Sequence, residues 1–214
     1  MLFKNILNYV YPNVCGLCGK SLKSNTYTCT ICKGILKYYK EKHLINCTGR
    51  YYEEVLSLYK YEGIIKEKIC KFKFRNHKYL GSFFGYLLSN KLKELKIEFD
   101  IIIPVPINLI RYMERGYNQS FLIAKEISKI MKKEMCNNVL FKFKRNKRQS
   151  ELHMNDRKNN VIGVYKTKNE NKVNEKIILL VDDIYTTGST IDECAKMLKK
   201  AGAKKVIAIT IAYA

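Results

Sequence analysis

From residue 49 to the C-terminus, apolar segments of strand length alternate with segments of helical periodicity. Five segments predict buried strands, at 99–106, 139–143, 160–165, 176–183 and 205–213. Four segments predict helices: a stretch with Ile65 and Ile69, 80–95, a stretch through Ile123, Ile127, Ile130 and Met131, and 190–201, which stops at Gly202. This alternation predicts an α/β fold with a mostly parallel sheet flanked by helices.

Residues 1–48 lack this alternation and hold five of the eight cysteines. The first dozen residues predict a short helix with one apolar face, made of Leu2, Phe3, Ile6, Leu7 and Val10. After them we expect no long helix or strand before residue 49. The chain is therefore expected to consist of a small N-terminal module, 1–48, and an α/β domain, 49–214.

Four of these cysteines have the spacing of a metal site. Cys15, Cys18, Cys29 and Cys32 spell C-x2-C-x10-C-x2-C, so two pairs of thiolates can meet at one tetrahedral Zn²⁺. So short a region buries little core, and a structural zinc ion would stabilise its fold. Redox dithiols or disulfides are the alternative, which a reducing compartment disfavours. Cys47, with His43 four residues before it, leaves open a second metal site.

Two adjacent carboxylates follow the predicted strand 176–183. Asp182 and Asp183 are expected at the carboxyl end of the sheet, where α/β folds bind ligands. The next residues lead into the N-terminus of a helix, whose free N–H groups attract phosphate: Thr186, Thr187, Gly188, Ser189 and Thr190. The aspartates suit the vicinal hydroxyls of a sugar, or a Mg²⁺ shared with it, so the predicted ligand is a ribose 5-phosphate. An ordinary capped turn is the alternative.

This stretch resembles the 5-phosphoribosyl-1-pyrophosphate (PRPP) motif of type I phosphoribosyltransferases. The resemblance implies a Mg²⁺–PRPP site at 182–190. In 6-oxopurine transferases the position of Thr186 holds an aspartate that contacts the base, so Thr186 argues against a purine-salvage enzyme.

Further segments resemble the ComF family of competence-associated proteins over nearly the whole chain. They are "YEGIIKEKICKFKF" at 61–74, "DIIIPVP" at 100–106, "RGYNQS" at 115–120, the spacing of Gln149, Arg157 and Asn160, and the cysteine pattern. The resemblance implies a type I phosphoribosyltransferase-like fold preceded by a zinc-binding module. It also implies a role in handling single-stranded DNA during natural transformation, with a competence helicase or other DNA-uptake proteins as partners.

The same resemblance assigns roles to two loops. The loop 107–119 would contact pyrophosphate, with Arg115, Asn118 and Gln119 as the contacts. The polar segment 144–160 would be the mobile loop that closes over the site, through Arg145, Arg148, Gln149 and Arg157. The alternative for these arginines is solvated loop surface.

The net charge of +21 changes the picture only in part. All but seven of the 40 basic residues are lysine, in a chain also rich in Ile, Asn and Tyr, so compositional bias competes with a nucleic-acid surface. No apolar run approaches the ~20 residues of a membrane span, and the N-terminus does not resemble a signal peptide. We therefore expect a cytoplasmic protein without membrane insertion.

Two functions remain open at this point. One is a PRPP-binding ComF-family protein that serves DNA import. The other is an active transferase that moves ribose 5-phosphate from PRPP to a nitrogenous acceptor, which no segment of the sequence identifies. A regulatory PRPP sensor is a third, weaker possibility.

Overall fold

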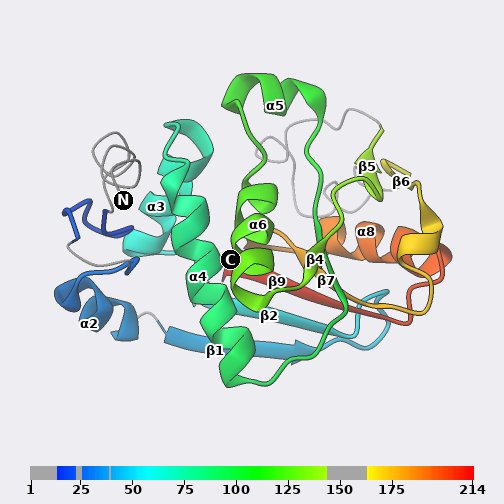
Figure 1. Ribbon diagram of the computed structural model, residues 1–214, viewed down its shortest axis with the longest axis horizontal. Coiled ribbons are helices and arrows are strands. Elements are labelled where there is room, and N and C mark those ends of the chain that lie inside the picture. The colour runs from blue at the N-terminus through cyan, green and yellow to red at the C-terminus, as the bar shows by residue number, and fades with distance from the viewer. Residues whose placement is uncertain (1–13, 23–25, 39, 144–162) are drawn as a thin grey trace, which may run out of the picture.

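The computed structural model describes residues 14–22, 26–38, 40–143 and 163–214 (Figure 1). The predicted N-terminal helix and the mobile-loop residues Arg145, Arg148, Gln149 and Arg157 lie outside these ranges. In the described part of the chain, no helix has both the length and the apolar character needed to cross a membrane.

The main sheet is mostly parallel, as predicted. Its strands run in the order β1 (Lys40–Asn46), β2 (Glu54–Lys60), β9 (Lys205–Tyr213), β7 (Ile177–Val181), β3 (Ile101–Pro104) and β4 (Glu134–Met135), and the short β8 (Ile184–Tyr185) also pairs with β9. Among the described residues, the β1–β2 pair is the only antiparallel pair in this sheet. Strand β7 lies between β3 and β9 in the sheet. The residues that follow β7 therefore leave the sheet at the carboxyl ends of its central strands.

Helices cover both faces of this sheet (Figure 1). One face packs against α3 (Gly63–Phe74), α4 (Tyr79–Glu94) and α6 (Gln119–Met131), and the other against α8 (Ser189–Lys200). Side chains alternate along β7, so Leu179 and Val181 enter the first core while Ile178 and Leu180 enter the second. Two buried layers therefore fix this strand firmly.

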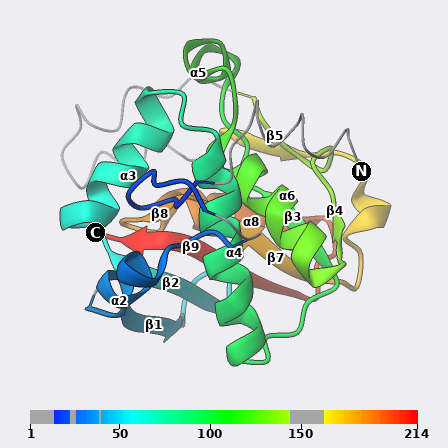
Figure 2. The same cartoon turned by 60° about the vertical axis from the view of Figure 1, so that its left-hand side comes forward.

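The remaining elements lie at the edges. The short helix α5 (Leu109–Arg115) follows β3, and a 3₁₀ turn covers Glu170–Lys172. The predicted strand at 139–143 is confirmed as β5 (Leu140–Lys142), but the one at 160–165 was placed too early, since β6 covers Tyr165–Thr167. These two strands form a separate antiparallel pair, which we call the ribbon. It lies beside α8 (Figure 1), and β5 lies apart from the strands of the main sheet (Figure 2).

The N-terminal region contains more regular structure than its sequence indicated. Helix α2 (Thr30–Tyr38) and strand β1 both precede residue 49. Helix α2 offers few apolar contacts, with Cys32 and Leu36 buried but Ile31 and Ile35 exposed. Strand β1 is a polar edge strand without hydrophobic alternation. The division of the chain near residue 48 remains a proposal, and β1 already belongs to the main sheet.

Candidate functional site

Asp182 directly follows β7 and is held by hydrogen bonds. Its Oδ1 accepts from Ser120 Oγ at 3.0 Å and from the Asp183 backbone N–H at 2.9 Å. Burial and the neighbouring charge of Asp183 raise the pKa of the Asp182 carboxyl to about 7, although these hydrogen bonds oppose the shift. A carboxyl group that is partly protonated near neutral pH therefore lies at the carboxyl end of the central strand β7.

Asp183 is paired with a lysine from a distant element. Lys73 Nζ, near the C-terminus of α3, lies 2.9 Å from Asp183 Oδ1, and both side chains are largely buried. The sequence analysis missed Lys73, because a lysine in "KFKF" of a lysine-rich chain resembles an ordinary solvent-facing helix position. Asp183 and Lys73 therefore form a largely buried ion pair in the site.

The segment after the acids forms a loop that ends at the N-terminus of α8. Gly188 is the residue before this helix and has φ +73°, a left-handed backbone conformation that favours glycine. A Cβ at Gly188 would lie 2.6 Å from Tyr52 Oη and 2.8 Å from Tyr185 Oη, so the surroundings also require glycine. Thr187 Oγ1 and Ser189 Oγ lie 2.8 Å apart. The loop of small hydroxyl side chains thus leads directly into the N-terminus of α8, where the helix dipole suits a phosphate. We call residues 186–190 the phosphate loop.

The turn between β1 and β2 braces this loop. Arg50 donates from Nη2 to the Thr187 carbonyl at 3.3 Å and pairs through Nη1 with Asp192 Oδ2 at 3.4 Å. The Tyr51 backbone N–H donates to Asp192 Oδ1 at 2.9 Å. The guanidinium therefore holds one peptide of the loop and the first turn of α8 in a fixed relation. We refer to this set of contacts as the Arg50 brace.

The acid pair, Lys73 and the loop after the acids line one cavity of about 160 Å³, which we call the central cavity; the Arg50 brace lies outside its lining. Its walls contain the whole stretch from Asp182 to Ile191, the main-chain turn after β3, and side chains from α3, α5, α6 and the ribbon. Four cationic side chains and two carboxylates face it: Lys73, Arg111, Arg115, Lys142, Asp182 and Asp183. This excess of positive charge suits an anionic ligand that also presents hydroxyl groups to the acids.

The loop 107–119 contributes part of the predicted set. Arg115 and Gln119 line the cavity, and Arg115 Nη1 donates to Gln119 Oε1 at 3.0 Å. Burial lowers the pKa of the Arg115 guanidinium, and the negative charge of nearby Asp183 partly opposes this shift. Asn118 has a different place: its Oδ1 accepts from the Ser120 N–H and its Nδ2 donates to the Val105 carbonyl. It caps α6 and is not among the residues that line the cavity.

The ribbon supplies two residues that the sequence analysis did not single out. Lys142 and Tyr165 are direct partners in the ribbon and both line the central cavity. Burial lowers the pKa of the Lys142 ammonium, as does the positive charge of Arg111. No local motif marks them, because their position follows from the packing of the ribbon on α8.

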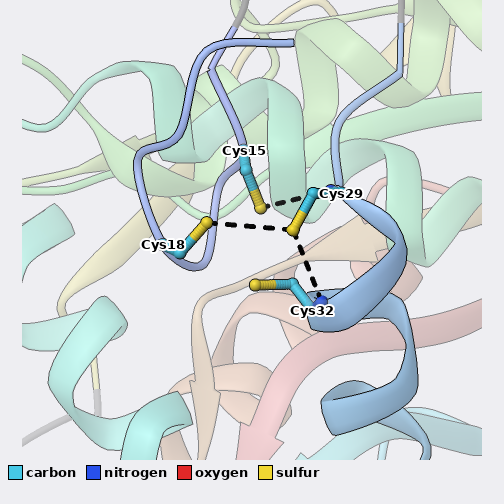
Figure 3. Close-up of side chains that lie close together, drawn as sticks. All are labelled: Cys15, Cys18, Cys29 and Cys32. Atoms are coloured by element: carbon cyan, nitrogen blue, oxygen red, sulfur yellow. Dashed lines mark hydrogen bonds between the residues drawn. The ribbon is translucent and has the colours of Figure 1, made fainter.

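The four N-terminal cysteines come together as predicted (Figure 3). Their sulfur atoms all lie within 4.8 Å of one another, and Cys18 Sγ and Cys29 Sγ are 3.9 Å apart. Four sulfurs at a Zn–S distance of ~2.3 Å would lie about 3.8 Å apart, so this cluster fits a tetrahedral metal ion. Although burial opposes it, backbone N–H groups of Cys18, Cys29 and Leu17 lower the pKa of the Cys15 thiol to about 7. Among the described residues Cys47 is not part of this cluster, and its thiol donates to the Ile45 carbonyl.

The cysteine module packs directly on the α/β part of the chain. Leu17 and Leu36 belong to the same buried cluster as Phe83 and Phe84 of α4. A Cβ at Gly16 would lie 2.1 Å from the Phe83 ring, so the backbone of the first cysteine loop touches this helix. Tyr27 stacks on Tyr86 with ring centroids 4.7 Å apart. The cysteine module therefore contributes side chains to the first core, on the side of α4.

Comparison with known proteins identifies the relatives of this chain. Residues 117–214 match the phosphoribosyl transferase domain. Competence protein F of Haemophilus influenzae is 30% identical over 94% of this chain and 90% of that protein. Competence protein ComFC of Bacillus subtilis is 27% identical over 96% of this chain and 80% of its own length. The DNA utilization protein YhgH of Escherichia coli K12 is 23% identical over 90% and 87%.

These matches agree with the predicted fold, a type I phosphoribosyltransferase-like sheet preceded by a four-cysteine module able to hold a metal such as zinc. The two competence proteins match more than 90% of the chain, and the domain match includes the acid pair and the C-terminal strand. The chain therefore belongs to the ComF family of competence-associated, phosphoribosyltransferase-like proteins.

Proposed function

We propose that this ComF-family protein binds Mg²⁺–PRPP in the central cavity and takes part in handling single-stranded DNA during natural transformation. The observation that carries the PRPP assignment is the convergence of the acid pair, the phosphate loop and four cations on one cavity. The 5-phosphate would bind the loop 186–190, the ribose hydroxyls would face Asp182 and Asp183, and the pyrophosphate would meet Arg111 and Arg115.

The oxygen-rich acid pair also fits Mg²⁺, which prefers carboxylate, phosphate and water ligands. The ion would neutralise charge on the pyrophosphate, and Lys73 would have to leave Asp183 if the metal or a ribose hydroxyl took its place. The zinc assignment of the cysteine cluster and a cytoplasmic location belong to the same proposal.

Calorimetry with Mg²⁺–PRPP tests the ligand assignment. Asp182→Ala combined with Asp183→Ala should weaken binding by roughly tenfold or more, because hydrogen bonds to charged groups contribute ~1.5–3 kcal/mol each. The exposed Glu62→Gln substitution removes a carboxylate outside the cavity and should leave binding unchanged. Ribose 5-phosphate without pyrophosphate should bind more weakly than PRPP. Unchanged PRPP affinity in the double variant would place the ligand elsewhere.

The DNA assignment rests on the family and on the charge. The relatives are competence and DNA utilization proteins by name, and the net charge of +21 favours a polyanionic partner. A dedicated site should bind single-stranded DNA more tightly than heparin at about 0.15 M salt. Equal binding of both polyanions would indicate that the positive charge reflects the amino-acid composition and does not form a DNA-binding site.

An active transferase is the second candidate. The cations that would hold bound pyrophosphate could also stabilise its departure from the ribose, since Arg111, Arg115 and Lys73 already surround the cavity. Release of pyrophosphate from PRPP, screened against nucleobases, nucleotides and DNA as acceptors, separates turnover from binding alone.

A further inference from the structure

The two faces of the ribbon have different chemistry. Phe141 pairs with Lys166 and Lys142 pairs with Tyr165, and successive side chains of a strand point to opposite faces. Lys142 and Tyr165 consequently face the central cavity. The opposite side carries four exposed residues, which we call the outer ribbon face: Phe141, Phe143, Lys166 and Lys168.

Two large aromatic rings are unusual on an exposed face. Phe143 is 62% exposed and Phe141 is 37% exposed. Each ring has a lysine above it: Lys166 Nζ lies 4.1 Å from the Phe143 ring centroid and Lys168 Nζ lies 5.4 Å from that of Phe141. Cation–π contacts at exposed positions are weak, so a ligand that offers both an aromatic plane and a negative charge can replace them.

A single-stranded nucleic acid has this combination of groups. Its bases present flat faces that stack on aromatic side chains, and its phosphates bind nearby lysines. In a duplex the neighbouring base pairs cover the faces of the bases, so the phenylalanine rings could not stack on them. Phe143 directly follows β5, and its N–H continues the pairing by donating to the Val164 carbonyl at 2.7 Å. Two residues of extended chain separate it from Phe141 by about 6.6 Å, within reach of neighbouring bases of an extended nucleic-acid strand.

We propose that the outer ribbon face is a binding surface for single-stranded nucleic acid, with bases stacked on Phe141 and Phe143 and phosphates bound by Lys166 and Lys168. This assignment rests on the proposed function for the class of partner, and it adds the location. The ribbon is held by Leu140, Val164 and Tyr165 in the second core and by the Gly163 N–H, which donates to Glu193 Oε1 at 2.8 Å. The stacking surface is therefore on an anchored element.

Fluorescence anisotropy with a short labelled oligothymidylate at about 0.15 M salt tests the surface. Phe141→Ala with Phe143→Ala should weaken binding roughly tenfold for each ring, and replacement of both by Trp should preserve it. Lys166→Ala with Lys168→Ala should reduce the slope of log affinity against log salt by about 1.4, since each single-strand phosphate contact contributes about 0.7.

The matched control is an aromatic–lysine pair elsewhere. Lys66 Nζ lies 5.9 Å from the Tyr61 ring centroid, and neither residue lines the central cavity, so Tyr61→Ala with Lys66→Ala removes the same chemistry from another surface. This control should bind the oligonucleotide as the wild type does. PRPP binding by calorimetry reports on the fold of each ribbon variant.

The possible failures are distinguishable. If the wild type binds the oligonucleotide and the double phenylalanine variant binds it equally well, the ribbon assignment is wrong while the DNA role stands. If the wild type does not bind it at this salt concentration, both the ribbon assignment and the DNA part of the proposed function fall. If the wild type does not bind PRPP, only the PRPP part of the proposed function is wrong.

Discussion

At the scale of single residues, the ionisation of Asp182 governs how the acid pair can meet a sugar. Its carboxyl accepts hydrogen bonds from Ser120 Oγ and from the Asp183 N–H, yet burial and the charge of Asp183 raise its pKa to about 7. Only the ionised form can accept hydrogen bonds from both ribose hydroxyls without itself supplying a proton. Ligand binding should therefore favour the deprotonated carboxyl.

The affinity for PRPP should accordingly increase with pH. With a free-state pKa of about 7, Asp182 is mostly protonated at pH 6 and mostly ionised at pH 8, so affinity should rise by roughly tenfold over this interval and level off above it. Calorimetry across the range measures the rise. In Asp182→Asn the contribution from this residue should disappear, leaving only the titration of the ligand phosphates. An identical pH profile in wild type and variant would contradict this account.

The acid pair and the phosphate loop could be predicted from the sequence because they are contiguous. One buried strand fixes where Asp182 and Asp183 emerge, and the small residues after them have an evident role at a helix N-terminus. Lys73, Lys142 and Tyr165 could not be predicted, since each reaches the cavity through tertiary packing of a different element. In a chain with so many lysines, residue type alone does not distinguish them.

At the scale of elements, the turn between β1 and β2 connects the edge of the sheet to the phosphate loop. Arg50→Ala removes the bond to the Thr187 carbonyl and the ion pair with Asp192. Because both partners are partly exposed, the expected loss of stability is only about 1 kcal/mol. The free energy of PRPP binding should decrease by more than this loss of stability. Without the brace, the phosphate loop would no longer be held in one conformation in the free protein, and binding would have to order it.

Thermal unfolding and calorimetry together measure this prediction. Arg50→Lys retains the charge but cannot donate to both partners in the same geometry, so it should resemble Arg50→Ala. Lys60→Ala, which breaks an exposed pair with Glu62, is the control and should change neither property. Wild-type PRPP affinity in Arg50→Ala would show that the phosphate loop does not need the brace.

Elements with a buried face were predicted well, and elements at edges were not. Strand β7 is apolar throughout, β9 is apolar apart from Lys205 and Thr210, and α8 has a clear apolar side, so their patterns identify them. Strand β1 is polar because it lies at the edge of the sheet, and β5 and β6 are only three residues each. Such short or one-sided elements take their structure from neighbours that the local sequence does not reveal.

At the scale of the whole molecule, the four-cysteine cluster is expected to stabilise more than its own loop. We predict one equivalent of Zn²⁺ per chain by elemental analysis, lost in Cys29→Ser and retained in Cys70→Ser, which alters a thiol outside the cluster. Since Leu17 and Leu36 share a core with α4, loss of the metal should also expose part of that core. The main thermal transition should then fall by several degrees, at roughly 2–4 °C for each kcal/mol. If Cys29→Ser loses its zinc but unfolds at the wild-type temperature, the module and the α/β domain are energetically independent; if it keeps full zinc occupancy, the metal assignment is wrong.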